Sequence, residues 1–220
     1  MDTKKNSNPN MVLAHDDGLI AGWKTAAEWR RCQAGLQVGG DPKVWGVAFD
    51  DFFITRLDLR YRNPIKMLQK GGRFQGEGFS ILTIQCSLIE YFESTIQGIK
   101  YRFTRNGQDL GKWEYSKSQE VFVEFLTNRP PFDSEFDQPL AEDFYRNVRC
   151  GLLHEARTKD GWRVRARGPN NEIIDGKGKL VFRDGFQVAL DKFVDWYSNQ
   201  LVTDPAMQQA FIRKFDDLCT

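Results

Sequence analysis

Large apolar side chains recur every four residues in two separate stretches of this chain. The first series is Phe49, Phe53, Leu57 and Tyr61, and the second is Leu140, Phe144, Val148 and Leu152. Side chains four residues apart lie one above the other on a helix. The spacing therefore predicts two helices, each buried along one stripe.

Other segments also show the apolar spacing of amphipathic helices. Together with the first two, we expect helices at about 25–34, 47–62, 79–98, 121–126, 139–156, 186–197 and 203–218. Asn63-Pro64 is expected to end or kink the second of them, because proline disfavours the helical conformation in the residue before it. Such a series of helices in 220 residues predicts one helical bundle.

The pattern changes after Arg157, where three apolar residues alternate with three arginines. They are Trp162, Val164 and Ala166, alternating with Arg163, Arg165 and Arg167. A period of two is typical of a strand. After a turn at 168–171, the apolar segments at 173–174 and 180–182 predict one or two partner strands.

We therefore expect a mainly α fold, in which a bundle of about five to seven helices carries a small antiparallel β-hairpin or sheet inserted at 161–183. The chain shows no internal repeat and no clear boundary, which predicts a single domain over residues 1–220. Residues 1–10 are polar and are expected to be disordered.

The bulk composition is that of an ordinary globular protein, with 40% hydrophobic and 28% charged residues. A formal net charge of +1 gives no global attraction to nucleic acid, so any such binding needs a local patch. Four widely spaced cysteines favour the reducing cytoplasm over a disulfide framework or a zinc site. No apolar run is long enough for a membrane helix and no signal core follows the N-terminus, so we expect neither membrane insertion nor secretion.

Residues 144–156 hold the most distinctive group of polar side chains in the chain. His154 is one of only two histidines, and Arg146 and Arg149 lie within about two helical turns of it. Counting about 100° per residue from Val148 places Arg146, Cys150 and His154 together on the side away from the core. A histidine beside guanidinium groups suits a phosphate ligand.

The segment Arg149-Cys150-Gly151-Leu152-Leu153-His154 resembles the signature of the HEPN superfamily. Members of that superfamily carry an arginine, four to six further residues and then a histidine on a helix of a small bundle. Val148 and Leu152 stand where family members usually have apolar residues, while Cys150 replaces a residue that is usually polar.

The resemblance implies a metal-independent endoribonuclease that acts on single-stranded RNA, or a relative that has kept the fold without the activity. The 2′-hydroxyl of RNA is the nucleophile, so the protein needs only to move protons and stabilise charge on phosphorus. A histidine, whose unperturbed pKa is about 6.5, suits both proton transfers, and we assign them to His154. One histidine is few for this reaction. In the family, a homodimer brings two copies of the motif together in a composite site, and the reaction requires no metal or cofactor.

Helix geometry leaves open which arginine holds the phosphate. On a straight α-helix Arg149 points about 140° away from His154, whereas Arg146 lies about 80° from it and about 12 Å further along the axis. Both arginines therefore remain candidates, and Asn147 beside Arg146 is a supporting candidate.

Other polar residues have a functional and a structural interpretation. Glu90 or Glu93 can orient a catalytic histidine from the neighbouring helix, or can simply belong to a solvated face. Likewise, Arg163, Arg165 and Arg167 form either an RNA-binding patch or an ordinary charged strand face. His154 itself can be a helix-end residue that interacts with the helix dipole.

A different class of function is therefore also open. A non-catalytic HEPN-like module that binds a protein partner or a nucleotide, within a toxin–antitoxin or defence system, would use the same fold. Catalysis requires His154 and an arginine to be exposed in a shared groove, whereas an interaction module can bury either residue.

Overall fold

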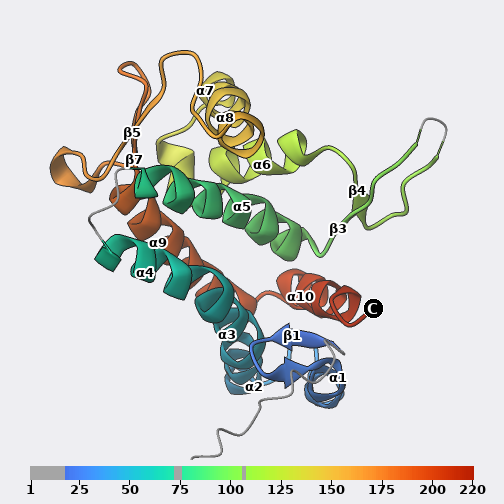
Figure 1. Cartoon of the computed structure of the whole chain (residues 1–220). Helices are drawn as coiled ribbons and strands as arrows, with labels where there is room; N and C mark the ends of the chain where they lie inside the picture. Colours follow the sequence, from blue (N-terminus) through green and yellow to red (C-terminus); the bar gives the residue numbers. More distant parts are fainter. Residues whose placement is uncertain (1–17, 72–75, 106–107) are drawn as a thin grey trace, which may run out of the picture.

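Helices dominate the computed structural model, which describes residues 18–71, 76–105 and 108–220 (Figure 1). The first half contains β1 (Leu19–Ala21), β2 (Lys24–Thr25), α1 (Ala26–Gln33), α2 (Pro42–Ala48), the π-helix η1 (Phe49–Ile54), α3 (Thr55–Leu57), the π-helix η2 (Asp58–Arg62), α4 (Asn63–Gly71), α5 (Glu77–Gln97) and β3 (Lys100–Tyr101). The second half contains β4 (Glu114–Tyr115), α6 (Ser118–Asn128), the 3₁₀-helix η3 (Phe132–Ser134), α7 (Gln138–Phe144), the π-helix η4 (Tyr145–Arg149), α8 (Cys150–Glu155), β5 (Arg163–Arg165), the 3₁₀-helix η5 (Pro169–Asn171), β6 (Ile174–Asp175), β7 (Leu180–Phe182), α9 (Arg183–Leu201) and α10 (Pro205–Asp217).

The predicted mainly α fold is confirmed. With contiguous α and π segments joined, the described residues form seven helices beside two small two-stranded sheets and one three-stranded sheet. The predicted disorder of residues 1–10 lies outside the described part of the chain. Within the described ranges, no helix has both the length and the apolar character needed to cross a membrane.

Helix α5 runs through the middle of the molecule (Figure 1). It contacts α4, α6, α8, α9 and α10. One connected cluster of buried side chains extends from Ile20 to Phe215 and includes most of the large aromatic residues. Because α5 is covered on most sides, its polar residues need partners on the surrounding elements.

Both helices with a four-residue apolar repeat contain π turns. Phe49, Phe53 and Leu57 are at most 2% exposed along the segment that holds η1 and η2. In a pure α-helix each step of four residues drifts by about 40° around the axis. A π turn uses about one more residue per turn and so removes that drift. The π turns therefore keep a strict four-residue repeat facing the core.

Of the two outcomes predicted for Asn63-Pro64, an end of the helix or a kink, the end is wrong. Asn63 has helical dihedral angles, with φ −65° and ψ −46°, and α4 continues from it to Gly71. Pro64 cannot donate a backbone hydrogen bond. It follows directly on the change from π to α hydrogen bonding at the end of η2, where a helix can accommodate a missing donor.

The β insertion is present, but the prediction of an entirely antiparallel sheet is wrong. The strand order is β5-β7-β6, in which β5 pairs parallel with β7 and β6 pairs antiparallel with it. After β5, the connection through η5 leads to β6, which is not adjacent to β5 in the sheet. Strand β7 then returns between the other two, which a period-two pattern cannot reveal.

One ion pair in the core joins α5 to the end of α6. Glu93 is fully buried, and its two carboxylate oxygens accept hydrogen bonds from Nε and Nη2 of Arg129 at 2.9 and 2.8 Å. Gln97 donates a third hydrogen bond to the same carboxylate at 2.6 Å. A buried carboxylate is stable only with such complete pairing.

Removing this charge should destabilise the fold. Glu93→Gln keeps the shape of the side chain but leaves Arg129 without its counter-charge, and we expect a loss of about 2–4 kcal/mol of unfolding free energy. Urea denaturation followed by circular dichroism measures it. As a matched control, Glu120→Gln breaks the exposed pair with Lys117 and should leave the midpoint unchanged. Equal effects of the two substitutions would contradict a structural role for the buried pair.

Candidate functional site

The helix that carries the predicted signature is continuous from Gln138 to Glu155 and consists of α7, η4 and α8. Phe144 and Val148 are fully buried and Leu152 is 6% exposed, so the predicted apolar stripe is confirmed. After α8 the chain turns back along the helix, and the Lys159 amide donates to the Asn147 carbonyl at 2.8 Å.

Gly151 permits this return. A Cβ atom at that position would lie 2.5 Å from the carbonyl oxygen of Arg157, which no side chain can accommodate. The returning loop therefore covers one flank of the signature helix, and α5 lies along another flank. The remaining face is open to solvent.

Arg149 belongs to the flank that faces α5. Its guanidinium lies 3.3 Å from the Glu90 carboxylate and 5.3 Å from the centre of the Tyr145 ring. The Tyr115 hydroxyl donates to the other oxygen of Glu90 at 3.0 Å. Burial, followed by the Glu90 charge, raises the pKa of Tyr115, which keeps this hydroxyl a donor. Glu90 thus fastens the signature helix to α5 and to the base of β4.

Arg146 and His154 lie on the solvent-exposed face. Within the described part of the chain, neither side chain has a hydrogen-bond or ion-pair partner. Leu153, next to His154, is an exposed apolar side chain at 54%. This face therefore offers an arginine, a histidine and an apolar contact to a ligand or partner.

The π turn changes the geometry between these residues. A π-helix rotates by roughly 80° per residue instead of 100°, so η4 reduces the offset between Arg146 and His154 from about 80° to roughly 20–30°. Arg149 lies at the end of η4, so its offset of about 140° from His154 is unaffected. The arginine that shares a face with His154 is Arg146.

The other predicted supporting residues make structural contacts. Asn147 is 9% exposed and donates to Asp143 at 2.7 Å, and the second oxygen of Asp143 accepts from the Trp162 indole at 2.7 Å. Glu93 bonds Arg129 rather than any residue of the signature helix. Of the two predicted carboxylates, only Glu90 contacts that helix.

The three arginines of the predicted RNA-binding patch are all exposed, but two have partners. Arg163 donates to the Gly178 carbonyl at 3.3 Å, and Arg167 pairs with Asp184 at 3.0 Å. Arg165, between them, has no partner within the described residues. Only Arg167 is therefore paired with a carboxylate, whereas Arg163 and Arg165 have no ion-pair partner within the described residues.

The chemistry available on the signature face is proton transfer and anion binding. In the residues that the structure describes, no three histidine, cysteine, aspartate or glutamate side chains are close enough to hold a metal ion. All four cysteines are free thiols. Tyr115 and Asp143 join the site through contacts with partners distant in sequence, and no spacing in the sequence links them to the signature.

No protein-family model, curated protein or solved structure matches this chain. The resemblance to the HEPN superfamily therefore stays a prediction that rests on the motif, and the roles of the site residues rest on the geometry described above.

The two arginines of the signature should differ in their effect on stability. Arg149→Ala leaves the Glu90 carboxylate, whose side chain is 18% exposed, without its counter-charge, and we expect a loss of about 1–3 kcal/mol. Arg146→Ala removes an exposed side chain with no described partner and should leave the urea midpoint unchanged. A larger loss for Arg146→Ala than for Arg149→Ala would contradict this division of roles.

Proposed function

We propose that this protein is a metal-independent endoribonuclease that cleaves single-stranded RNA at a composite site of a homodimer. The observation that carries the proposal is that Arg146 and His154 are both exposed on one helix, where the π turn η4 reduces the angle between them. The resemblance to the HEPN signature supplies the reaction class.

A two-fold axis explains how the two side chains can act together. Arg146 and His154 are about 12 Å apart along one helix, which is too far for both to contact the same phosphate easily. Position 150 lies four residues from each of them. If two signature helices pack antiparallel around that position, Arg146 of one protomer faces His154 of the other, and this happens twice. Leu153 adds an exposed apolar contact for such an interface.

The reaction then follows from the side chains. His154 takes the proton of the 2′-hydroxyl, whose oxygen attacks phosphorus, and the bond to the 5′-oxygen breaks. The imidazolium returns the proton to that leaving oxygen, so the products are a 2′,3′-cyclic phosphate and a 5′-hydroxyl end. Arg146 of the opposite protomer binds the non-bridging oxygens and stabilises the charge that develops on them.

A non-catalytic role is the second candidate, and one observation favours it. The arginine that best fits the family spacing is Arg149, and Glu90 already holds it. An interaction module of a toxin–antitoxin or defence system can use the exposed face of Arg146, Leu153 and His154 to bind a protein partner without cleaving RNA.

Loss of the imidazole should separate these candidates. We expect His154→Ala to reduce cleavage of a single-stranded RNA by about 10²–10⁴-fold with little change in stability, since the side chain is exposed. Arg146→Ala should reduce cleavage as well. The control Arg157→Ala removes an exposed arginine that pairs with Glu155 and should retain full activity.

The assay should detect 2′,3′-cyclic phosphate ends, and cleavage should persist in excess chelator. Loss of cleavage in chelator would contradict the mechanism. If the wild-type protein cleaves no RNA but binds a partner through the same face, the interaction module is the correct function.

Mixing the two inactive variants tests the composite site. In a heterodimer of Arg146→Ala and His154→Ala chains, one of the two sites regains both functional side chains and the other lacks both. Random exchange makes half of the dimers heterodimers, so we expect recovery to about a quarter of wild-type activity. A site within one chain would recover none, and a strict monomer in light scattering would also exclude the arrangement.

A further inference from the structure

The segment that begins with β3 and ends with β4 projects from the body of the molecule (Figure 1). We call residues 100–115 the aromatic arm, of which the structure describes 100–105 and 108–115. Three of its aromatic side chains are exposed, Tyr101 at 53%, Phe103 at 73% and Trp113 at 42%. Large apolar side chains gathered on one exposed segment indicate a binding surface.

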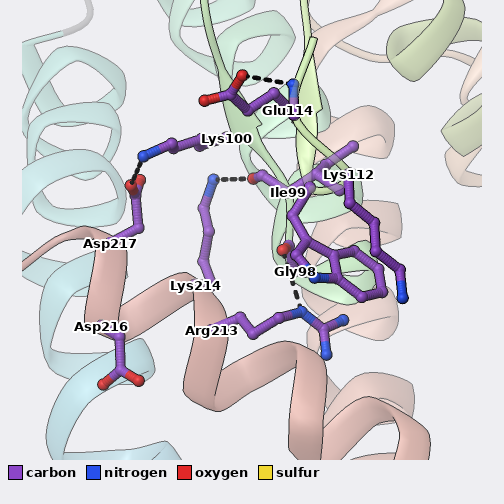
Figure 2. Close-up of a pocket in the computed structure, with 11 residues that line it drawn as sticks. Gly98, Ile99, Lys100, Lys112, Glu114, Arg213, Lys214, Asp216 and Asp217 are labelled. Carbon is purple, nitrogen blue, oxygen red and sulfur yellow. Dashed lines mark hydrogen bonds and ion pairs between the residues drawn. The ribbon is translucent and has the colours of Figure 1, made fainter.

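The arm is held firmly where it leaves the body. Lys214 of α10 is only 8% exposed, and its ammonium donates to the Ile99 carbonyl, directly before β3, at 3.0 Å (Figure 2). The same ammonium donates to the Ser94 hydroxyl of α5 at 2.8 Å. Two helices therefore fix the first residues of the arm, while its outer part is exposed.

A row of aromatic side chains on the arm starts beside the signature helix. Tyr101 lies opposite Tyr115 in the parallel pair of β3 and β4, with ring centres 5.7 Å apart. The Tyr115 hydroxyl donates to Glu90, the carboxylate that also holds Arg149. Side chains two residues apart in an extended segment point to the same side, so Phe103 continues the row by about 7 Å. The row therefore runs from the contact with the signature helix to the exposed part of the arm.

The arm is locally basic, in a chain that is nearly neutral. It contains four lysine or arginine residues and two acidic ones, and each of the aromatic residues Tyr101 and Phe103 is next to a basic residue in the sequence. Lys100 and Arg102 have carboxylate partners at 3.0 and 2.8 Å.

Two cations of the arm remain available for a ligand. Arg105 and Lys112 are exposed, and neither has a carboxylate partner within the described ranges. Figure 2 shows the Lys112 ammonium pointing away from the labelled carboxylates. In the same ranges, Asp109 is the only acidic residue of the arm without a partner, so the unpaired charge of the arm is positive.

We propose that the aromatic arm binds single-stranded RNA, with unpaired bases stacked on Tyr101 and Phe103 and phosphates held by Arg105 and Lys112. The proposal rests on the proposed function, from which it takes the class of substrate. Rings that alternate with cations match a strand in which bases alternate with phosphates. Every base has a face that can stack, so the arm accepts many sequences. In a duplex those faces are covered by neighbouring base pairs, so the arm selects single strands.

Fluorescence anisotropy of the full chain with a labelled single-stranded 2′-O-methyl oligonucleotide tests the proposal. The methyl group blocks the 2′-hydroxyl, so this probe reports binding without cleavage. We expect Phe103→Ala and Phe103→Leu each to weaken binding by about 5- to 100-fold, because neither side chain offers an aromatic face to a base. Phe103→Trp keeps such a face and should bind like the wild type. Tyr101→Ala should weaken binding by a similar factor.

The charges are tested through the salt dependence of the same binding. Arg105→Gln and Lys112→Gln should each weaken binding at low salt and reduce the slope of log affinity against log salt by about 0.7. Met67→Ala is the matched control, because it removes a side chain of α4 that is 74% exposed, and it should bind like the wild type. Phe103 is exposed, so its variants should keep the urea midpoint of the wild type.

Three results would overturn the proposal. They are no binding of the probe, wild-type affinity in Phe103→Leu, and equal affinity for the probe annealed to its complement. Loss of self-association rather than of RNA binding in Phe103→Ala would instead make the arm a contact between copies of the chain. Failure of the proposed function looks different, because the wild type would then bind the probe through the arm but cleave no unmodified RNA. Cleavage with probe binding unchanged in Phe103→Ala would leave the proposed function intact and remove the arm from it.

Discussion

The architecture depends on satisfying the polar side chains of a helix that is nearly enclosed by its neighbours. Along α5, Gln85 bonds α9, Glu90 bonds η4 and β4, Glu93 bonds the residue after α6, and Ser94 bonds α10. Each contact joins α5 to a different part of the chain. Because unpaired polar groups in such a position are costly, these contacts fix the neighbouring elements in place as well as satisfying α5. The aromatic core accounts for most of the buried apolar surface, and these four polar side chains of α5 determine which elements can pack around it.

One of these contacts also shapes the candidate site. Glu90 holds Arg149, so the signature helix can rotate little around its axis, and the buried residues Phe144 and Val148 limit it further. With one flank on α5 and another under the returning loop, the only open face is the one that carries Arg146 and His154. The π turn places those two side chains in line. The same helix therefore carries Arg149, which has a structural role, and the exposed pair Arg146 and His154. The Arg-x4-His motif alone does not separate these two roles.

Much of the fold was predictable from local sequence, and the errors have physical causes. The four-residue repeats identified the helix around Phe53 and the helix around Val148, since burial of either residue requires the whole stripe to face inward. The π turns were not predicted, although a strict repeat of four over twelve residues already differs from the period of 3.6. The parallel pairing of β5 and β7 depends on the path of the connection, which no local pattern records. Lys214 had a visible signal, because it lies between Phe211 and Phe215 on an otherwise apolar helix face. Its partners Ser94 and Ile99 are too distant in sequence to be inferred.

Disulfide trapping between protomers tests the central claim most directly. Arg146→Cys and His154→Cys chains, each with Cys150→Ser to remove the neighbouring thiol, are mixed and mildly oxidised, and the linked peptides are mapped by mass spectrometry. The antiparallel arrangement predicts a covalent dimer that joins position 146 of one chain to position 154 of the other, with far less linkage in either variant alone. Links that join 146 to 146 or 154 to 154 with similar yield, or no link between chains at all, would contradict the composite site.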